Sequence, residues 1–306
     1  MEIIGHAKIL DFFVKVIDSG HINHAYCFVG PENVGKKTVA EYISAQLIGT
    51  PFAKLAINLD FILVDQVFDE KTEKTKKDIS VSQIRTLREQ LARRSYYGGY
   101  KVAVINGAEK MNSEACNALL KTLEEPSEKT VLFLITTDEK SLPETIQSRC
   151  QNIYFYPVAK DLIKKHLEKN GTSNANELAQ FSFGLPGRAC EWASDNESYE
   201  WYKQEVSRFS SLFKKNFHEK IKTVEELFGD KTDHIATRTT LFDVLNIWQW
   251  LVRDSILKDY SLHNLKIELD NKNAIDLYKK IEDAKQMLGQ NIHPRLLVEN
   301  ILLQIP

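Results

Sequence analysis

The stretch His24-Ala-Tyr-Cys-Phe-Val-Gly-Pro-Glu-Asn-Val-Gly-Lys-Lys-Thr38 decides the fold that the sequence predicts. Its first part, Ala25–Val29, is a short apolar run typical of a buried strand, and Val39–Leu47 has the pattern of a helix. The residues between them, Gly30-Pro-Glu-Asn-Val-Gly35-Lys36, have the spacing of a phosphate-binding loop. A turn with a solvated lysine could match this pattern by chance. The position between a strand and a helix instead favours an altered phosphate loop.

Each part of such a loop has a defined task. Glycines such as Gly30 and Gly35 let backbone N–H groups curl round phosphates, and Lys36 would reach the terminal phosphates. The full pattern continues with a serine or threonine whose hydroxyl binds Mg²⁺, but Lys37 stands there and Thr38 follows one residue late. One residue along a helix turns a side chain by about 100°, and an ammonium is electrostatically wrong beside a bound cation. Nucleotide binding stays open, whereas Mg²⁺-dependent hydrolysis is expected to be impaired.

A later apolar strand, Val102–Ile105, lacks the acidic residues that hydrolysis needs. A hydrolytic ATPase of this type ends that strand with an aspartate for Mg²⁺, often followed by a glutamate that activates water. Asn106 and Gly107 occupy these positions, and Glu109 lies two residues beyond the base position, where a solvated surface glutamate is the simpler interpretation. Lysine, asparagine and glycine thus replace a hydroxyl, a carboxylate and a base, and together they indicate a non-hydrolysing relative of an ATPase.

Alternating strand and helix patterns predict an α/β domain over residues 1–157. Buried strands that alternate with helices indicate a parallel sheet covered on both faces. The charged stretch Asp69–Asp78 has no apolar residue and is expected to be an exposed loop. The remaining expected elements are strands at Phe61–Val64 and Val131–Ile135 and helices at Ile9–Ile17, Val81–Arg93 and Ser113–Leu123.

The strand pattern fades after Pro157. Residues 158–197 predict a small helical domain, and residues 198–306 predict a larger all-helical domain. In the larger domain, aromatic and apolar residues are compatible with either a contact to another chain or the domain's own core. These residues are Phe242, Leu245, Trp248 and Trp250.

Composition excludes several classes of protein. The chain has 306 residues and a formal net charge of −2, which argues against a free-standing, charge-driven nucleic-acid binder. Its four cysteines are far apart, so a zinc site built on close cysteine pairs is not expected. These cysteines are Cys27, Cys116, Cys150 and Cys190. The N-terminus does not have the pattern of a signal peptide and no apolar run is long enough to span a bilayer, so a cytoplasmic protein without membrane contacts is expected.

Four segments resemble the clamp-loader subunits of the AAA+ family. Asn117-Ala-Leu-Leu-Lys-Thr-Leu-Glu-Glu-Pro126 is similar to their NALLKxLEEP helix, and Ser148-Arg149-Cys150 to their SRC motif. His24–Pro31 is similar to the strand that enters the phosphate loop, and Gly184–Ala189 to the sensor-2 region of the small lid domain. The matches cover residues 1 to about 190, and the last domain agrees only in its helical layout.

This resemblance implies a fold and a role for particular residues. It implies an AAA+ P-loop-like domain, a helical lid domain and an all-α C-terminal collar domain for oligomerisation. Arg149 would be a trans arginine finger that enters a neighbour's ATP site, and a structural arginine that caps a helix is the alternative. Arg188 would be the sensor-2 arginine, which without hydrolysis would hold the lid domain against the first domain; an arginine on the lid surface is nearly as good an interpretation.

The degenerate site most resembles that of the delta-prime subunits of bacterial DNA polymerase III. The resemblance implies a non-hydrolysing part of the polymerase holoenzyme, in a hetero-pentamer with the motor (tau/gamma) and delta subunits. The sliding clamp and the primer-template DNA would be contacted through the assembly. ATP or ADP could bind without hydrolysis at Gly30, Gly35, Lys36 and Thr38. The family's four-cysteine zinc module has no counterpart in Gly49–Asn58, so no zinc is expected.

Two other functions remain as alternatives: an active tau/gamma-like ATPase motor, and an AAA+-derived scaffold without a role in replication. A small-molecule kinase explains the paired motifs less well.

Three groups of residues keep a simpler interpretation. Thr136 and Thr137 fall in the sensor-1 region, where a threonine often bonds only to the backbone. Glu124 and Glu125 belong to the motif, but a solvated helix end explains their charge equally well. A basic run with interleaved tyrosines is compatible with tracking of DNA phosphates, but a solvated helix face is preferred. The run comprises Arg85, Arg88, Arg93, Arg94 and Lys101, with Tyr96 and Tyr97.

Overall fold

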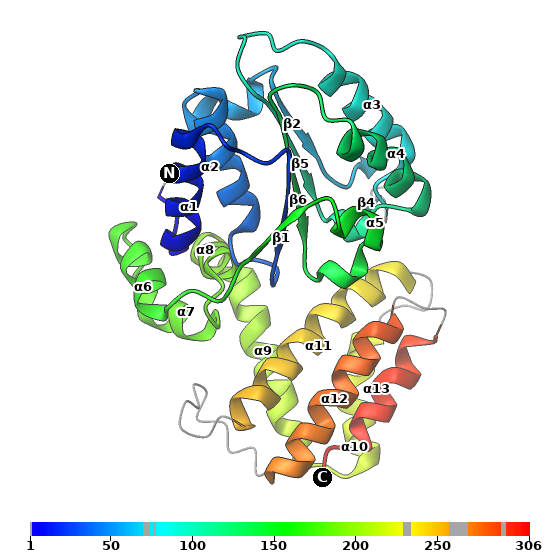
Figure 1. Ribbon diagram of the computed structural model, residues 1–306. Coiled ribbons are helices and arrows are strands. Elements are labelled where there is room, and N and C mark those ends of the chain that lie inside the picture. Colours follow the sequence, from blue (N-terminus) through cyan, green and yellow to red (C-terminus); the bar gives the residue numbers. More distant parts are fainter. Residues whose placement is uncertain (1, 70–73, 76–77, 229–233, 257–268, 289–291) are drawn as a thin grey trace. The chain divides into compact units, whose positions relative to one another are not determined.

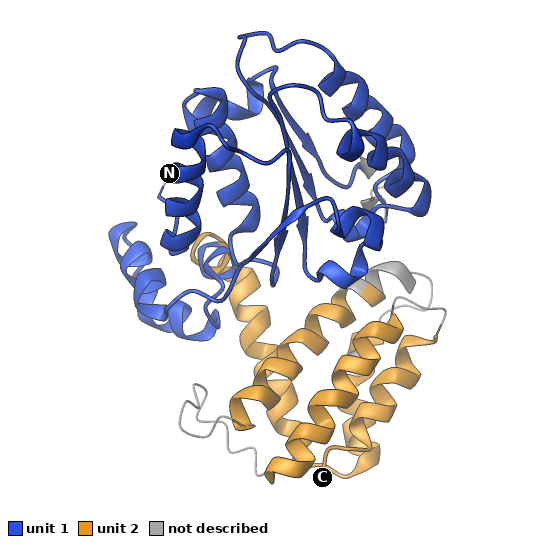
Figure 2. Ribbon diagram, viewed as in Figure 1, with its two compact units in different colours: residues 1–190 blue, residues 191–306 orange. Residues whose placement is uncertain are grey.

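The computed structural model describes residues 2–69, 74, 75, 78–228, 234–256, 269–288 and 292–306 (Figure 1). The chain divides into two compact units, residues 1–190 and 191–306 (Figure 2). The finer division of the chain at residues 157 and 197 stays a prediction.

The first unit is built on a five-stranded sheet whose order is β2-β5-β6-β1-β7. Every neighbouring pair of these strands is parallel. Parallel strands need crossover connections, and these carry the helices. The predicted α/β class with a parallel sheet is confirmed. The strands are β1 (Ala25–Val29), β2 (Phe61–Val64), β5 (Lys101–Asn106), β6 (Thr130–Thr136) and β7 (Gln151–Tyr154).

Helices cover both faces of this sheet, with α1 and α2 on one face and α3 and α4 on the other (Figure 1). Side chains at the first residues fix where two of them begin. The Ser80 hydroxyl and Gln83 form a capping box in front of α3, and the Asn112 side chain accepts the N–H of Ala115 in front of α4. The helices are α1 (Ala7–Ser19), α2 (Lys36–Ile48), α3 (Val81–Ala92), α4 (Ser113–Glu124) and α5 (Glu144–Gln147). Short 3₁₀ turns lie at Phe52–Ile57, Ala108–Lys110 and Glu139–Ser141.

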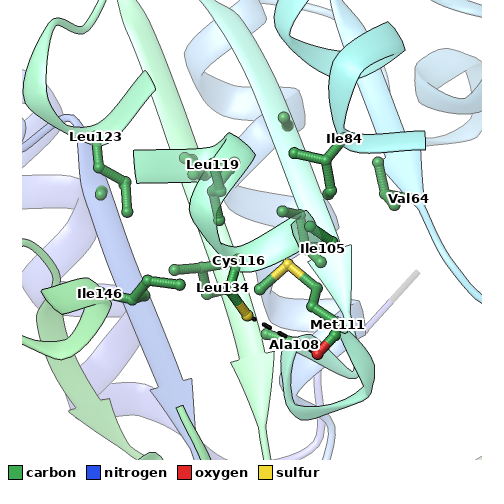
Figure 3. Close-up of a cluster of buried hydrophobic side chains, with 14 of the residues drawn as sticks. Val64, Ile84, Ile105, Ala108, Met111, Cys116, Leu119, Leu123, Leu134 and Ile146 are labelled. Carbon is green, nitrogen blue, oxygen red and sulfur yellow. Dashed lines mark hydrogen bonds between the residues drawn. The ribbon is translucent and has the colours of Figure 1, made fainter. Parts of the chain in front are cut away.

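Alternating residues of the strands enter two different cores. On β1, Cys27 faces α3, α4 and α5 as part of an aliphatic core, whereas Tyr26 and Phe28 lie in an aromatic cluster with Phe13 of α1 and Phe133 of β6. Figure 3 shows the aliphatic core, in which side chains of α4 and α5 pack over the strands. The labelled members are Val64, Ile84, Ile105, Ala108, Met111, Cys116, Leu119, Leu123, Leu134 and Ile146.

The structure differs from the sequence prediction at three places. The stretch Asp69–Asp78 is not wholly a loop, because β3 (Phe68–Asp69) pairs antiparallel with β4 (Lys74–Thr75); residues 70–73 and 76–77 lie outside the described residues. Strand β7 was not predicted, because it is an edge strand with two polar residues among its four. Helix α2 begins at Lys36, inside the phosphate-loop motif.

A group of short helices follows the sheet. They are α6 (Lys160–Lys169), α7 (Ala175–Phe181) and α8 (Pro186–Ser194). The predicted helical character of this segment is confirmed, and the boundary between the two units falls within α8.

The second unit is entirely helical among its described residues, as predicted. Its core contains Leu245 and Trp248, both fully buried, whereas Phe242 is exposed. Leu245 and Trp248 are therefore core residues, whereas the exposed Phe242 and the half-buried Trp250 keep the alternative of a contact with another chain. The elements are α9 (Asn196–Leu212), α10 (Phe217–Val224), a 3₁₀ turn (Glu225–Phe228), α11 (His234–Ile256), α12 (Asn271–Leu288) and α13 (Pro294–Leu302). None of the described helices is both long and apolar enough to cross a membrane.

Candidate functional site

The phosphate-loop motif connects β1 to α2, as its pattern predicts. Both of its glycines are required by the backbone. Gly30 has φ 154°, and a Cβ there would lie 2.5 Å from the carbonyl oxygen of Phe155. Gly35 has φ 108°, in the region that L side chains rarely adopt. The loop is held from outside by the Nε2 atom of His6, which lies 2.8 Å from the carbonyl oxygen of Val34.

Lys36 is buried within its own loop. Its side chain is 6% exposed, and its ammonium donates to the carbonyl oxygens of Gly30 at 2.5 Å and Pro31 at 2.7 Å. Burial lowers the pKa of Lys36 from 10.5 to about 8, although Glu109 and Glu32 act in the opposite direction. Glu109 is half-buried rather than solvated, and its charge acts on the lysine of the loop.

The buried ammonium of Lys36 predicts a pH-dependent stability. Between pH 8 and 10.5 the unfolded chain keeps a proton on Lys36 that the folded chain has lost, so the free energy of unfolding should rise with pH over this interval. Relative to Lys36→Met, the wild type should gain up to about 3 kcal/mol. Urea unfolding followed by circular dichroism at pH 7 and pH 10 measures this gain, and Lys37→Met controls for the loss of a lysine. An unchanged difference between wild type and Lys36→Met at the two pH values would contradict the prediction.

Lys37, in the position of the Mg²⁺-binding hydroxyl, pairs with a carboxylate that sequence reasoning missed. Its ammonium lies 3.2 Å from Oδ2 of Asp65, and the Asn106 amide donates to the same oxygen at 2.9 Å. Burial raises the pKa of Asp65, but the hydrogen bonds from Asn106, the Gln66 N–H and Lys37 outweigh it, so that the pKa is lowered. Asp65 therefore stays ionised at neutral pH as the partner of a lysine.

The sequence feature that could have identified Asp65 as a site residue is its position directly after strand β2. Strand β2 lies beside β5, so the residues that follow the two strands meet at the same edge of the parallel sheet. Asn106 ends β5, and α2 carries Lys37 to this edge. Thr38 is half-buried on the same helix, and none of the hydrogen bonds described for the loop reaches its hydroxyl.

Arg149 follows α5 and is held by two parts of its own chain. Its guanidinium donates to the carbonyl oxygen of Thr145 at 2.8 Å and forms an ion pair with Glu124 at 2.9 Å. The Arg149 side chain is 35% exposed, so the guanidinium remains accessible from solvent. Glu124 is the last residue of α4, so the structure brings the two motif segments together.

The residues on either side of Arg149 anchor it. The Ser148 hydroxyl donates to the carbonyl oxygen of Thr145, and the Cys150 side chain packs against the aliphatic core. Burial raises the pKa of the Cys150 thiol to about 12, so the thiol is unreactive at neutral pH. Cys150 is therefore a packing residue beneath an accessible arginine.

Helix α8, which carries Arg188, contacts the phosphate loop directly. The N–H of Gly187 donates to the carbonyl oxygen of Asn33 at 2.8 Å. A Cβ at Gly187 would lie 2.9 Å from that oxygen, so the close approach needs glycine. Arg188 itself is half-buried, which agrees better with a packing role than with a freely solvated side chain.

The basic run does not form one continuous surface. Lys101 is 4% exposed, and its ammonium donates to the carbonyl oxygens of Gln90 and Arg93 at the end of α3, so it belongs to the interior. Tyr96 and Tyr97 are 60% and 70% exposed. A groove of about 450 Å³ between α3 and α4 contains Arg85 and Arg88, which lie opposite Lys121 and Glu114.

The remaining predicted site residues have local roles. The Thr136 hydroxyl donates to the carbonyl oxygen of Asp138 at 2.9 Å, which matches the expected bonding to backbone. Within the described part of the chain, no group of three or more histidine, cysteine, aspartate or glutamate side chains is arranged to hold a metal ion.

A family model described as "DNA polymerase III, delta subunit" matches residues 5–159, which is about half of the chain and includes the whole sheet. The chain belongs to this family. The chain is 40% identical over 135 residues to the DNA polymerase III subunit delta′ of Pseudomonas aeruginosa, an alignment that covers 42% of this chain and 41% of that protein. It is 23% identical to the subunit delta′ of Bacillus subtilis over 97% of this chain and 95% of that protein.

A subunit with a different name also matches. The DNA polymerase III subunit gamma of Buchnera aphidicola is 31% identical over 195 residues, which cover 58% of this chain and 51% of that protein. The chain thus spans about half the length of this relative and 41% of the Pseudomonas one. The matched family segment contains the phosphate loop, Asp65, Asn106, Glu124 and Arg149.

Proposed function

We propose that the chain is a clamp-loader subunit of a bacterial DNA polymerase III that does not hydrolyse ATP itself. It would act as a scaffold of the loader ring and complete the ATP site of a neighbouring subunit while the sliding clamp is loaded onto primed DNA. Family membership and the delta′ relatives support the assignment to the polymerase.

The Lys37–Asp65–Asn106 network carries the proposal that the chain has no ATPase activity. A hydrolytic site needs a hydroxyl and a carboxylate for Mg²⁺ at this edge of the sheet. Here a lysine ammonium lies within 3.2 Å of the carboxylate of Asp65, and Asn106 uses its amide to bond the same oxygen. A divalent cation would have to displace an ammonium that already neutralises this carboxylate, so the network disfavours Mg²⁺.

Arg149 supports the proposed role toward a neighbour. Guanidinium is always charged and binds phosphate oxygens through a fork of donors, which suits a finger that reaches an ATP bound to another chain. The accessible guanidinium on a packed base of Cys150 and Ile146 meets this requirement. The partners proposed are a tau/gamma motor subunit and a delta subunit, with the sliding clamp and DNA reached through the assembly.

At the phosphate loop of this chain we propose only that a nucleotide binds, without being hydrolysed. Gly30, Gly35 and Lys36 retain the elements that bind phosphate, but Lys36 is bonded to its own loop and would have to change partners. Arg188 would help to hold α8 on the loop. We propose no zinc for this chain.

The match to a gamma subunit favours a second candidate, an active ATPase motor. The two candidates make opposite predictions for the isolated chain. A non-hydrolysing subunit should show no steady-state ATP turnover above that of Lys36→Ala, a variant that lacks the loop's ammonium and therefore reports contaminating ATPases. Turnover of the wild type clearly above this control would support the motor. Co-purification with the motor and delta subunits tests the assembly, and failure to form any complex would contradict the proposal.

A further inference from the structure

The ion pair between Glu124 and Arg149 joins two segments that are 25 residues apart in the sequence. Packing fixes both ends of this pair. Leu123, the neighbour of Glu124 on α4, and Ile146 of α5 are buried in the same aliphatic core, as Figure 3 shows. The carboxylate and the guanidinium therefore face each other because the end of α4 and the residues after α5 are held over the same core.

The contact uses donors that a phosphate would also need. One terminal nitrogen of Arg149, Nη1, donates to the carbonyl oxygen of Thr145, and the other, Nη2, lies 2.9 Å from Oε1 of Glu124. Arginine binds phosphate most strongly when both of its nitrogens engage two oxygens at once. Nη2 carries two N–H donors, and the one that points to Glu124 becomes available to a phosphate oxygen only when the carboxylate leaves.

We propose that Glu124 is a positioning residue that acts as an internal competitor of phosphate for Arg149. This inference rests on the proposed finger role of Arg149. Glu124 holds the guanidinium in one orientation while the neighbouring ATP site is empty, and the more highly charged terminal phosphate of ATP then replaces it. Both side chains are partly exposed, at 35% for Arg149 and 49% for Glu124, so the pair is weak enough to open. Exposed ion pairs change an equilibrium constant by a factor of about 1.4 to 5.

The test uses the reconstituted complex with its motor and delta subunits. Glu124→Gln removes the charge and keeps the shape, so it should lower the KM for ATP by about 1.4- to 5-fold and leave kcat unchanged. Glu125→Gln is the matched control, because it removes the same charge one residue further along, and it should leave both constants unchanged. The double variant Glu124→Gln/Arg149→Ala should behave like Arg149→Ala alone, because the carboxylate acts only through the arginine.

The possible failures can be told apart. If Arg149→Ala leaves turnover unchanged, the finger role itself is wrong. If Arg149→Ala slows turnover but Glu124→Gln changes neither KM nor kcat, or lowers kcat, only the competitor role of Glu124 is overturned. An equal fall of KM in Glu125→Gln would assign the effect to general surface charge and also overturn the proposal. Circular dichroism of each variant, compared with the wild type, detects any loss of folding.

Discussion

On the proposed finger role, alanine at position 149 is expected to slow ATP hydrolysis at the interface that this chain would complete by about 10³-fold or more. Arginine fingers supplied in trans contribute about 10³–10⁵ in rate, because they neutralise charge that develops on the terminal phosphate. Pre-steady-state phosphate release by the reconstituted complex is the appropriate measurement, because a site that hydrolyses ATP about 10³-fold more slowly no longer contributes to the fast phase. That site's share of the fast phase should disappear, whereas the other sites should keep their rates.

The variant should keep its fold. The Arg149 side chain contributes one partly exposed ion pair and hydrogen bonds to the Thr145 carbonyl oxygen and the Ser148 hydroxyl, and exposed pairs stabilise by about 1 kcal/mol or less. Arg149→Lys separates charge from geometry, because an ammonium cannot fork onto two phosphate oxygens. It should recover only a small part of the rate. A normal fast phase in Arg149→Ala would assign the arginine to the alternative structural role.

The central strands and the loop were predictable, because their signals are local. An apolar run such as β5 must be buried on both faces, and Gly30, Gly35 and Lys36 recur at a spacing set by the geometry of phosphate. Strand β7 carries no such signal. It pairs on one side only, with β1, and Gln151 and Asn152 remain partly exposed there.

The polar contacts of the site were not predictable, because they depend on strand order. Asp65 meets Asn106 only because β2 and β5 are neighbours, and nothing in the 41-residue separation of the pair reveals this. The same holds for Glu124 and Arg149. For Lys101 the charge was misleading, because charge alone predicts a surface position. Its place at the start of β5 instead directs its ammonium to carbonyl oxygens at the end of α3.

Glu205→Ala is expected to destabilise the second unit by about 3 kcal/mol. Glu205 is 1% exposed in α9, accepts the indole N–H of Trp248 at 2.7 Å, and pairs with Arg208 at 2.6 Å. Alanine leaves a buried indole donor without this acceptor and a largely buried guanidinium without this carboxylate. Removing one partner of a buried ion pair costs about 3–5 kcal/mol, and the partial exposure of Arg208, 21%, places the effect at the lower end.

Tryptophan fluorescence measures this unit selectively, because all four tryptophans of the chain lie within residues 191–306. The urea midpoint of the fluorescence transition in the full chain should fall by about 1–3 M, given slopes of about 1–3 kcal/mol per molar urea. Glu200→Ala is the matched control, since Glu200 is on the same helix and its ion pair with Lys203 is exposed. Its midpoint should change little. Equal midpoints for the two variants would contradict the prediction.

The pH dependence of stability distinguishes the contribution of the Glu205 charge from that of its packing. Burial raises the pKa of Glu205, although Arg208 and the bond from Trp248 act in the opposite direction. A carboxyl whose pKa is higher in the folded chain contributes stability below its unfolded pKa and loses that contribution as the pH rises through the folded value. Glu205→Gln keeps an acceptor for Trp248 without a titratable group. The stability of the wild type relative to this variant should therefore fall as the pH rises from 4.5, because only the wild type must then bury an ionised carboxylate.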